Sequence, residues 1–252
     1  MNTRPTLKPN YKPPEGGERL AKLVAKLKSC SRSEAEQYID NGYVLVNGRV
    51  VTEPGFRVRG ETVTLAAGAN LDPIPEVTFV LNLSANFRSG DPHPIHEKSH
   101  GPLDPSPIRW HPKHLKDLET FAPLERGAGG LIVLTQDFRI ARKLHEDERV
   151  LEHEFSVEVA SPVEDAALEF LNKRIDLSRW GLSLLKVSVG SSNEKTTRLR
   201  FALKGYQLGV VAALCEEVRW KLLGIKRLRL GRVALAGLPE GQWRYLQDFE
   251  RF

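Results

Sequence analysis

The chain has 252 residues, a formal net charge of +5, 40% hydrophobic residues and 27% charged residues. This composition is typical of a folded globular protein, and no apolar run reaches the roughly 18 residues of a membrane-spanning helix, so we expect no membrane contact and a cytoplasmic location. The two cysteines, Cys30 and Cys215, are too few for a disulfide framework.

The first 16 residues are polar and rich in proline, and they include the basic residues Arg4, Lys8 and Lys12. This segment lacks both the apolar side chains of a folded core and the apolar centre of a signal peptide. We predict that residues 1–16 form a disordered basic tail.

Residues 17–66 contain signals for two short helices and a hairpin. Apolar side chains recur at helical spacing over residues 20–39. Ser31 and Glu34 have the spacing of a capping box, which predicts that a second helix begins directly after Ser31. The pair Asn47-Gly48 between two β-rich runs is a strong signal for a hairpin.

The segments Cys30-Ser-Arg-Ser-Glu-Ala35 and Val46-Asn-Gly48 resemble the S4 RNA-binding domain, and the resemblance covers residues 17–66. It implies that a ridge of basic side chains contacts the phosphates of folded RNA, where shape and charge dominate recognition. The alternative is a solvent-exposed basic helix face that binds no partner. The candidate RNA-binding residues of this domain are Arg19, Lys22, Lys26, Lys28 and Arg32.

Residues 66–75 are rich in glycine and proline and predict a linker to a second domain over residues 76–252. The patterns predict strands at residues 78–83, 130–135, 154–159, 184–189 and 197–203, and helices at residues 138–144, 163–172 and 208–218. Strands and helices follow one another without a regular βαβ repeat. We therefore expect an α+β fold: a small N-terminal S4-like domain, then a larger domain around a mixed sheet.

Residues 88–114 predict a long irregular loop, because six prolines interrupt the segment. Five of the seven histidines lie here, and imidazole is a common metal ligand. No cysteine accompanies them, so we favour a variable surface loop and predict no metal site. The role of this loop does not follow from its composition.

Two further motifs resemble those of an enzyme family. Pro123-Leu-Glu-Arg-Gly-Ala-Gly-Gly-Leu-Ile-Val-Leu-Thr-Gln-Asp137 and residues 224–246 are similar to the catalytic and C-terminal motifs of bacterial ribosomal RNA pseudouridine synthases with an N-terminal S4 domain. The resemblance extends from Arg19 to Leu246. It implies a monomeric isomerase that converts uridine to pseudouridine in structured RNA, most of all ribosomal RNA, without a metal or small-molecule cofactor.

The catalytic motifs depart from the family at two positions. Glu125 stands where the resemblance implies the nucleophilic aspartate, and Phe155 replaces a tyrosine that lies against the flipped base. The longer glutamate stem displaces its charge by roughly 1 Å, a shift that can cost about a hundredfold in rate. Phe155 can still stack on a base, but it has no hydroxyl.

A third departure concerns residues 207–215, which align with a helix that in the family carries the arginine paired to the catalytic carboxylate. No arginine occurs in this segment. A buried carboxylate without a cationic partner has a raised pKa and tends to stay protonated. Arg126 and the basic residues of segment 219–232 are candidates for a replacement partner.

A second basic strip contains Lys226, Arg227 and Arg229, where charged residues alternate with Leu228 and Leu230. This alternation predicts a strand with one charged face. The charged face either contacts RNA or protects a sheet edge from pairing with another chain.

Two hypotheses remain for the function. The first is an RNA-binding protein of this family in which catalysis is lost or impaired, because three separate motifs each lack a different part of one mechanism. The second is an active pseudouridine synthase that uses Glu125 as its carboxylate. Both hypotheses predict binding of structured RNA with a marked dependence on salt.

Overall fold

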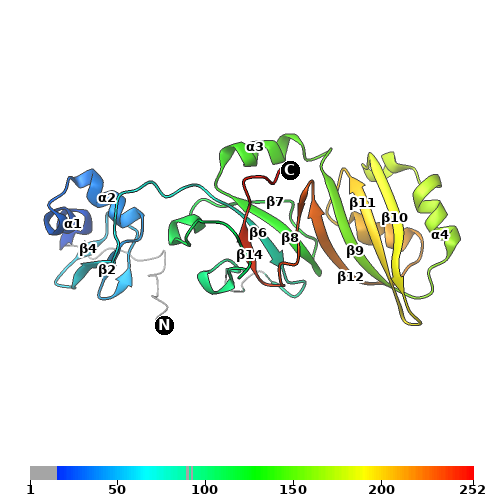
Figure 1. Cartoon of the computed structure of the whole chain (residues 1–252), viewed down its shortest axis with the longest axis horizontal. Coiled ribbons are helices and arrows are strands. Elements are labelled where there is room, and N and C mark those ends of the chain that lie inside the picture. The colour runs from blue at the N-terminus through cyan, green and yellow to red at the C-terminus, as the bar shows by residue number, and fades with distance from the viewer. Residues whose placement is uncertain (1–15, 89–90, 92) are drawn as a thin grey trace. The chain divides into compact units, whose positions relative to one another are not determined.

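The computed structural model describes residues 16–252 except residues 89, 90 and 92. The tail predicted for residues 1–16 therefore lies outside the described residues, apart from Gly16. Both parts of the chain combine helices and strands, so the fold is α+β (Figure 1). The chain divides into two compact units, Met1–Pro75 with His111–Lys116 and Glu76–Trp110 with Asp117–Phe252.

The first unit contains a pair of helices and several short strands. Helices α1 (Leu20–Lys28) and α2 (Arg32–Asp40) share one aliphatic core with strand β2 (Val44–Val46). Strand β2 pairs with both β3 (Arg49–Val50) and β5 (Val63–Leu65), and β1 (Glu18–Arg19) pairs with β4 (Arg57–Val58). The unit thus buries one side of each helix against a small sheet.

The local signals in this unit form the structures that they predict. The Glu34 N–H donates to Ser31 Oγ at 3.2 Å, and the Ser31 N–H donates to Glu34 Oε2 at 2.7 Å. This capping box starts α2 at Arg32. Asn47 and Gly48 have positive φ angles of 49° and 77°, which a two-residue hairpin turn of this kind requires.

The segment His111–Lys116 belongs to the first unit by its contacts. Lys113 Nζ donates to Asn41 Oδ1 at 3.1 Å, and the His111 ring lies edge-on to Tyr43 with centroids 5.4 Å apart. The last residues of the predicted loop 88–114 therefore pack on the first unit, which the sequence does not predict.

The second unit is built around one large mixed sheet. Its strands follow the order β10-β11-β9-β12-β8-β6-β14, with β13 paired to β12 and β7 paired to β8. Strands β12 and β8 are parallel and the other strand pairs are antiparallel, so the predicted mixed sheet is confirmed. The strands are β6 (Thr78–Leu83), β7 (Glu119–Phe121), β8 (Ala128–Thr135), β9 (Glu152–Ala160), β10 (Leu184–Ser192), β11 (Thr196–Lys204), β12 (Leu222–Leu230), β13 (Val233–Ala234) and β14 (Trp243–Tyr245).

The helices of this unit include α3 (Phe138–Glu146), α4 (Asp165–Glu169) and α5 (Val210–Glu217). The helix predicted at residues 163–172 is not uniform, because α4 continues into a wider turn at Phe170–Arg174. From this turn the Asn172 amide donates to the Val187 carbonyl at 2.8 Å and accepts from the Val187 N–H at 2.9 Å. Asn172 thereby covers part of the free edge of β10.

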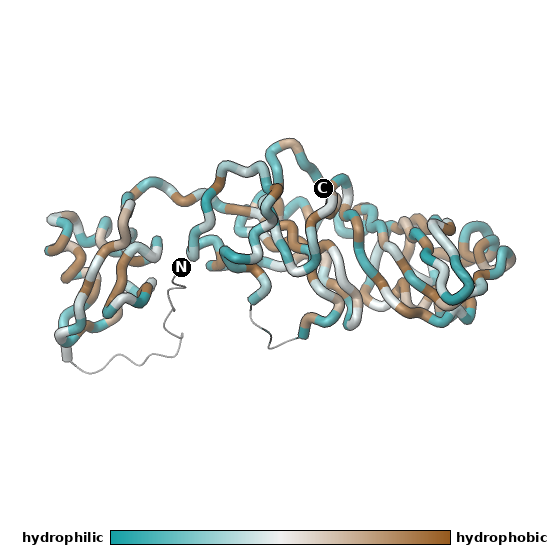
Figure 2. Tube along the Cα trace, turned by 60° about the horizontal axis from the view of Figure 1, so that its bottom comes forward, coloured by the Kyte–Doolittle hydropathy of each residue, from teal (hydrophilic) through white to brown (hydrophobic). Residues whose placement is uncertain are grey.

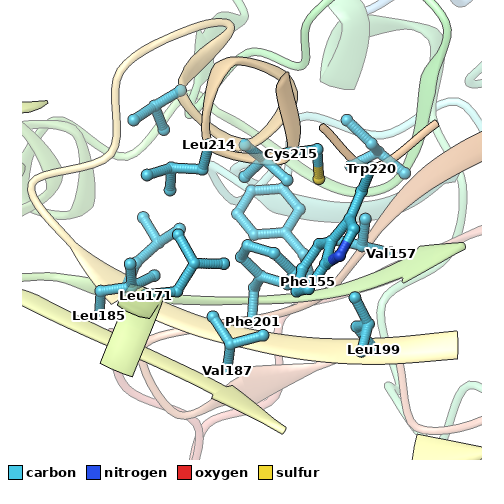
Figure 3. Packing of buried hydrophobic residues seen from close by; sticks show 14 of the residues in the cluster. Phe155, Val157, Leu171, Leu185, Val187, Leu199, Phe201, Leu214, Cys215 and Trp220 are labelled. Atoms are coloured by element: carbon cyan, nitrogen blue, oxygen red, sulfur yellow. The ribbon is translucent and has the colours of Figure 1, made fainter. Parts of the chain in front are cut away.

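Alternation along β9 directs one face of the sheet into the core. Phe155, Val157 and Val159 are buried, and polar residues alternate with them along the strand. Figure 2 shows hydrophilic and hydrophobic segments in alternation along the strands of this unit. Leu214 and Cys215 of α5 belong to the same apolar cluster (Figure 3). Burial of each large apolar side chain contributes roughly 2 kcal/mol, so this cluster holds α5 on the sheet.

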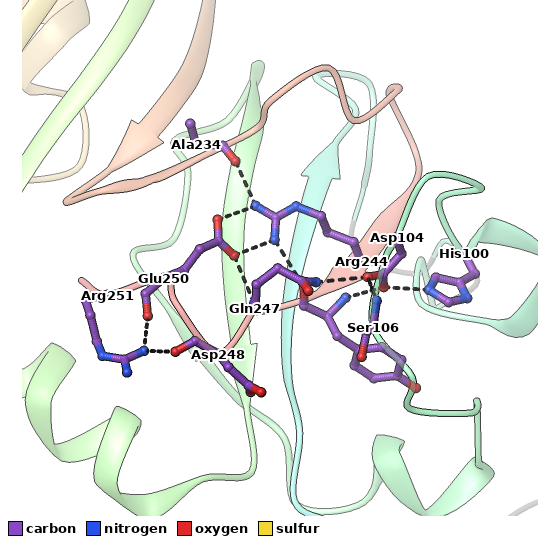
Figure 4. Close-up of polar contacts among 10 residues, drawn as sticks. His100, Asp104, Ser106, Ala234, Arg244, Gln247, Asp248, Glu250 and Arg251 are labelled. Atoms are coloured by element: carbon purple, nitrogen blue, oxygen red, sulfur yellow. Dashed lines mark hydrogen bonds and ion pairs between the residues drawn. The ribbon is translucent and has the colours of Figure 1, made fainter.

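A polar network ties the C-terminal segment to the loop that precedes β7 (Figure 4). The Asp104 side chain is fully buried. Its carboxylate accepts from His100 Nε2 at 2.7 Å, the Tyr245 N–H at 2.8 Å, Gln247 Nε2 at 2.9 Å and the Ser106 N–H at 3.0 Å. Burial opposes the ionisation of Asp104, but the hydrogen bonds from His100, Tyr245 and Ser106 outweigh it and lower the pKa of its carboxyl.

The described part of loop 88–114, which was predicted to be a surface loop, is buried in places. Ile95 is fully buried, and the His100 ring stacks on Trp243 with centroids 4.1 Å apart. Among the described residues, no group of three or more His, Cys, Asp or Glu side chains is placed to hold a metal ion. The contacts described for His100 and His111 are ring packing and hydrogen bonds.

In the part of the chain that the structure describes, no helix combines the length and the apolar character needed to cross a membrane.

Asp104→Asn should destabilise the protein by about 2 kcal/mol, because the asparagine amide faces donors that the carboxylate now satisfies. Urea unfolding of this variant, with the exposed Asp248→Asn as control, measures the loss. The lowered pKa means that the contribution of Asp104 is present above the unfolded pKa of about 4 and is lost as the pH falls through the folded pKa. If the difference in unfolding free energy between wild type and Asp104→Asn does not shrink as the pH is lowered, the charge of Asp104 does not have this stabilising role.

Candidate functional site

Glu125 lies in the short loop between β7 and β8. Ala122 and Gly127 of this loop have positive φ angles of 49° and 82°, and the Glu125 carbonyl accepts from the Ala128 N–H at 3.0 Å. Gly127 adopts its conformation without steric cost, whereas Ala122 occupies a region that residues with a Cβ rarely enter. The loop thus fixes the backbone of Glu125 just before the buried strand β8.

The Glu125 carboxylate is partly buried and lacks an ionic partner. Its Oε1 atom has no hydrogen-bond partner among the described residues, which also form no ion pair with this carboxylate. Burial raises the pKa of the carboxyl, and the Gly209 N–H and the positive charge of Arg227 oppose this rise without cancelling it. Glu125 therefore favours its protonated form more than an exposed glutamate does.

Gly209 brings the start of α5 close to this carboxylate. It is the N-cap residue of the helix and has a φ angle of 85°. A Cβ on Gly209 would lie 3.8 Å from Glu125 Oε2. The positive end of the helix dipole therefore faces the carboxylate and favours its ionised form to a limited degree.

Arg227 acts on Glu125 through its charge, but its guanidinium is bound elsewhere. The side chain is fully buried. Its Nε donates to the Leu131 carbonyl at 2.9 Å, its Nη2 donates to the Ala122 carbonyl, and its Nη1 lies 3.3 Å from His153 Nδ1. Burial lowers the pKa of Arg227 to about 10, which leaves it cationic at neutral pH.

The burial of Arg227 contradicts the prediction that this residue contacts RNA. Gly130 in β8 has a φ angle of 103°, and a Cβ there would overlap the backbone of Arg227. The glycine therefore lets β8 and β12 approach closely. A register shift between β12 and β9 falls between Arg227 and Arg229, and such a bulge changes the direction of neighbouring side chains.

Three rings stack beside Arg227. The Tyr206 ring centroid lies 4.7 Å from that of His153 and 5.2 Å from that of Phe155, with interplanar angles of 25° and 35°. Arg227 Cζ lies 5.6 Å from the Phe155 centroid and 5.7 Å from the Tyr206 centroid. Phe155, the predicted base-stacking residue, is fully buried and already has Tyr206 against it.

The polar rings of this stack are uncharged at neutral pH. Burial, followed by the charge of Arg227, lowers the pKa of His153 to about 3. Burial, followed by the charge of Glu125, raises the pKa of Tyr206 to about 12. Tyr206 is not among the predicted site residues, and its one signal in the sequence is its position directly after Gly205 at the end of a predicted strand.

Helix α5 contributes aliphatic side chains to the site. Val210, Val211, Leu214 and Cys215 are buried in the apolar cluster that includes Phe155. Burial raises the pKa of the Cys215 thiol to about 12, so the thiol is not a nucleophile at neutral pH. The segment predicted to lack an arginine partner for Glu125 thus packs as core.

A cavity of about 280 Å³ opens beside the ring stack. It lies against β7 and α3, and the chain after β11 forms another of its walls. Glu125 is not among its lining residues, which include Phe121, Leu144, His145, His153, Tyr206 and Leu208.

The predicted RNA-binding residues of α1 are exposed. Arg19 lies at the surface directly before the helix. The Lys22 and Lys26 side chains are 68% and 63% exposed, and both contact Glu18 Oε1, at 3.1 Å and 2.8 Å. Surface ion pairs of this kind contribute little, so both lysines remain available to another anion.

The other predicted cations of the first unit also lie at the surface. Arg32 Nε lies 2.9 Å from Glu36 Oε1 and its side chain is 70% exposed. Lys28 Nζ lies 5.7 Å from the Tyr38 ring centroid. The first unit thus carries its five predicted cations on or beside α1 and at the start of α2.

The second basic strip is less open than the first. Lys226 is partly exposed. Arg229 Nη2 lies 2.6 Å from Glu152 Oε1 and 2.8 Å from Glu154 Oε2, so two carboxylates already neutralise it. Of the three basic residues in this strip, Arg227 is buried and Arg229 is paired with carboxylates. Lys226 is the one that is neither buried nor paired in this way with a described residue.

The first unit is a small module with two helices, the second of them capped. The second unit is a mixed sheet with a carboxylate in one of its loops. These features define an α+β protein with an S4 domain. The model of the S4 domain family matches residues 18–63. The dual-specificity RNA pseudouridine synthase RluF of Escherichia coli O6:H1 is 26% identical over 94% of this chain and 78% of its own length.

Two further proteins extend this comparison. Ribosomal large subunit pseudouridine synthase B of Bacillus subtilis is 26% identical over 92% of this chain and 93% of its own length. A crystal structure of a pseudouridylate synthase aligns with 91% of this chain and 96% of that chain, at 19% identity and a TM-score of 0.48. The chain contains an S4 domain. It is homologous to the pseudouridine synthase RluF and to ribosomal large subunit pseudouridine synthase B.

Glu125→Gln should raise the melting temperature near neutral and alkaline pH, because it removes a charge that burial disfavours. The sign follows from the raised pKa: folded protein holds the proton longer than unfolded protein, so wild-type stability falls as the pH rises through the folded pKa. The gain should vanish below the unfolded pKa of about 4.3. Melting curves at both ends of this range, with the exposed Glu216→Gln as control, test it; a lower melting temperature at alkaline pH would contradict it.

Proposed function

We propose that this chain is an RNA-binding protein of the pseudouridine synthase family in which the isomerisation step is lost or impaired. Residues 17–66 form its S4-like RNA-binding domain, and residues 76–252 form its synthase-like domain. Its partner is structured RNA, most of all ribosomal RNA. The observation that carries the catalytic part is the Glu125 carboxylate, which is partly buried, has no ionic partner among the described residues and has a raised pKa.

Two observations support RNA binding. The relatives are named as RNA pseudouridine synthases, and the S4 family model matches residues 18–63. The cations around α1 and α2 are exposed, and their acidic partners belong to surface ion pairs that exchange readily. Phosphates can replace these partners with release of counterions, so affinity should fall with salt.

The catalytic part follows from what the reaction requires. A nucleophilic carboxylate must be ionised, and a neighbouring cation favours that state. Arg227 donates to backbone carbonyls, so it acts on Glu125 only through the field of its charge. Phe155 supplies no hydroxyl, and Tyr206 lies against its ring. Among the described residues Glu125 thus forms no ion pair that would favour its ionised form, and the face of Phe155 is already covered by Tyr206.

An active synthase that uses Glu125 is the second candidate. The Gly209 N–H and the charge of Arg227 both lower the pKa of Glu125 relative to burial alone. Both interactions favour an ionised fraction of the carboxyl. Neither candidate function involves a metal or a small-molecule cofactor.

Incubation with 5-fluorouridine-containing ribosomal RNA fragments separates the two candidates. The wild type should form no covalent adduct and no pseudouridine. Glu125→Asp should be equally inert, because the shorter side chain still lacks a guanidinium partner. An adduct that the wild type forms and Glu125→Gln does not would establish the active synthase. Pseudouridine mapping of ribosomal RNA from cells with and without the gene provides an independent readout.

The double variant Lys22→Ala, Lys26→Ala should weaken RNA binding and reduce its log–log salt slope by about 2, roughly one unit for each phosphate contact. Filter binding of structured ribosomal RNA across a salt series measures both effects. Lys173→Ala with Arg174→Ala removes two exposed cations from the second unit and serves as the matched control. Equal losses of RNA affinity in the two double variants would mean that Lys22 and Lys26 are not specific RNA contacts. A wild type that retains no structured RNA at low salt would overturn RNA binding altogether.

A further inference from the structure

We infer that Tyr206 is a plug built into this site: its ring fills the space beside Phe155 and His153 and separates the neighbouring cavity from the Glu125 carboxylate. The inference rests on the proposed function, since it names the residue that keeps a pyrimidine base away from the acid. It deepens that proposal with a cause that is independent of the missing arginine.

The backbone around Tyr206 holds the ring in place. Gly205 precedes it with a φ angle of 83°, and a Cβ on Gly205 would overlap the Gly181 carbonyl. The chain therefore passes close to Gly181 directly after β11, through a conformation that favours glycine. Tyr206 thus leaves β11 in a fixed direction, toward the loop that carries Glu125.

The contacts of the ring are those of a stacked base. Tyr206 lies nearly parallel to His153 at 4.7 Å and tilted against Phe155 at 5.2 Å. The Arg227 guanidinium lies 5.7 Å from the same ring, and the attraction of a cation to an aromatic face adds to the stack. A planar ring of another molecule would have to displace Tyr206 to gain these contacts.

Two buried polar atoms at this position are poorly satisfied. Neither Glu125 Oε1 nor Tyr206 Oη has a partner with full hydrogen-bond geometry among the described residues, and the Glu125 N–H is the backbone group that lowers the pKa of the Tyr206 phenol relative to burial alone. Buried polar groups are nearly always paired, so two such atoms from neighbouring residues of one site are unusual. A phenol hydroxyl can donate, and a carboxylate oxygen can accept. With the Tyr206 ring removed, an N–H of a pyrimidine such as uracil could donate to the Glu125 oxygen instead.

The cavity beside the ring stack borders Tyr206. Tyr206 and His153 line it, whereas Glu125 does not. Its volume of about 280 Å³ is near the lower end of small-ligand pockets, which begin at roughly 300 Å³. The Tyr206 ring therefore belongs to the partition between a ligand-sized space and the acid. Removal of the ring should join the two.

Chemical rescue of Tyr206→Ala tests the plug. The matched control is Tyr245→Ala, because Tyr245 is also a buried tyrosine of the second unit, stacked on Phe79 at 5.3 Å. We expect p-cresol to raise the melting temperatures of both variants, since it has the shape of the deleted side chain. Uracil should raise only that of Tyr206→Ala, by about 3 °C at roughly ten times its dissociation constant.

The same experiment contains the results that overturn the inference. Uracil that stabilises neither variant, or both equally, would exclude a base-specific space at residue 206. If Tyr206→Ala does not fold, the wild type decides: uracil at millimolar concentration should leave the carboxyl ¹³C signal of Glu125 unchanged, and a saturable shift would contradict the plug.

RNA retention, measured on the same wild-type protein, separates this inference from the proposed function. Loss of the uracil effect while structured RNA is still retained would remove the plug alone. A wild type that retains no RNA, with uracil rescue of Tyr206→Ala intact, would overturn the proposed function and leave the plug in place.

Discussion

The buried guanidinium of Arg227 is the interaction on which the site depends. It holds the loop of Glu125 against β8, because it donates to the Ala122 carbonyl at the start of that loop and to the Leu131 carbonyl in β8. A buried cation needs several such partners to offset its desolvation. Because its N–H groups point at these acceptors, the guanidinium cannot also form a bidentate ion pair with the Glu125 carboxylate. The fold thus secures the loop and leaves the acid without its counter-ion.

The other features of the site also leave Glu125 without a cationic partner. Helix α5 places Val211 and Leu214 in the core, where a cationic side chain would have to be desolvated. Its N-cap residue, Gly209, offers Glu125 a backbone N–H and a helix dipole, which are weaker than a full charge. Tyr206 then fills the space against Phe155. The second unit thus combines this site with homology to pseudouridine synthases, and the first unit carries exposed cations.

Local chemistry was predictable from the sequence where neighbours in the chain decide it. Ser31 and Glu34 form the capping box, and Asn47-Gly48 forms the turn, because both motifs are satisfied within a few residues. The mixed sheet followed from strand signals and the order of elements. The burial of Arg227 was not predicted, because a bulge and the close approach of Gly130 on another strand decide the direction of its side chain. Tyr206 was not predicted as a site residue, because its ring contacts come from residues about 50 positions away, such as His153.

A direct titration of the Glu125 carboxyl tests the central claim that this acid lacks an effective cationic partner. ¹³C NMR of the protein can follow the carboxyl carbon across the acid range, with Glu125→Gln to assign the signal. Burial without an ion pair predicts a pKa for Glu125 above the ordinary glutamate value of about 4.3. A pKa at or below that value would mean that a cation holds the carboxylate ionised, and the impaired-catalysis proposal would then be wrong.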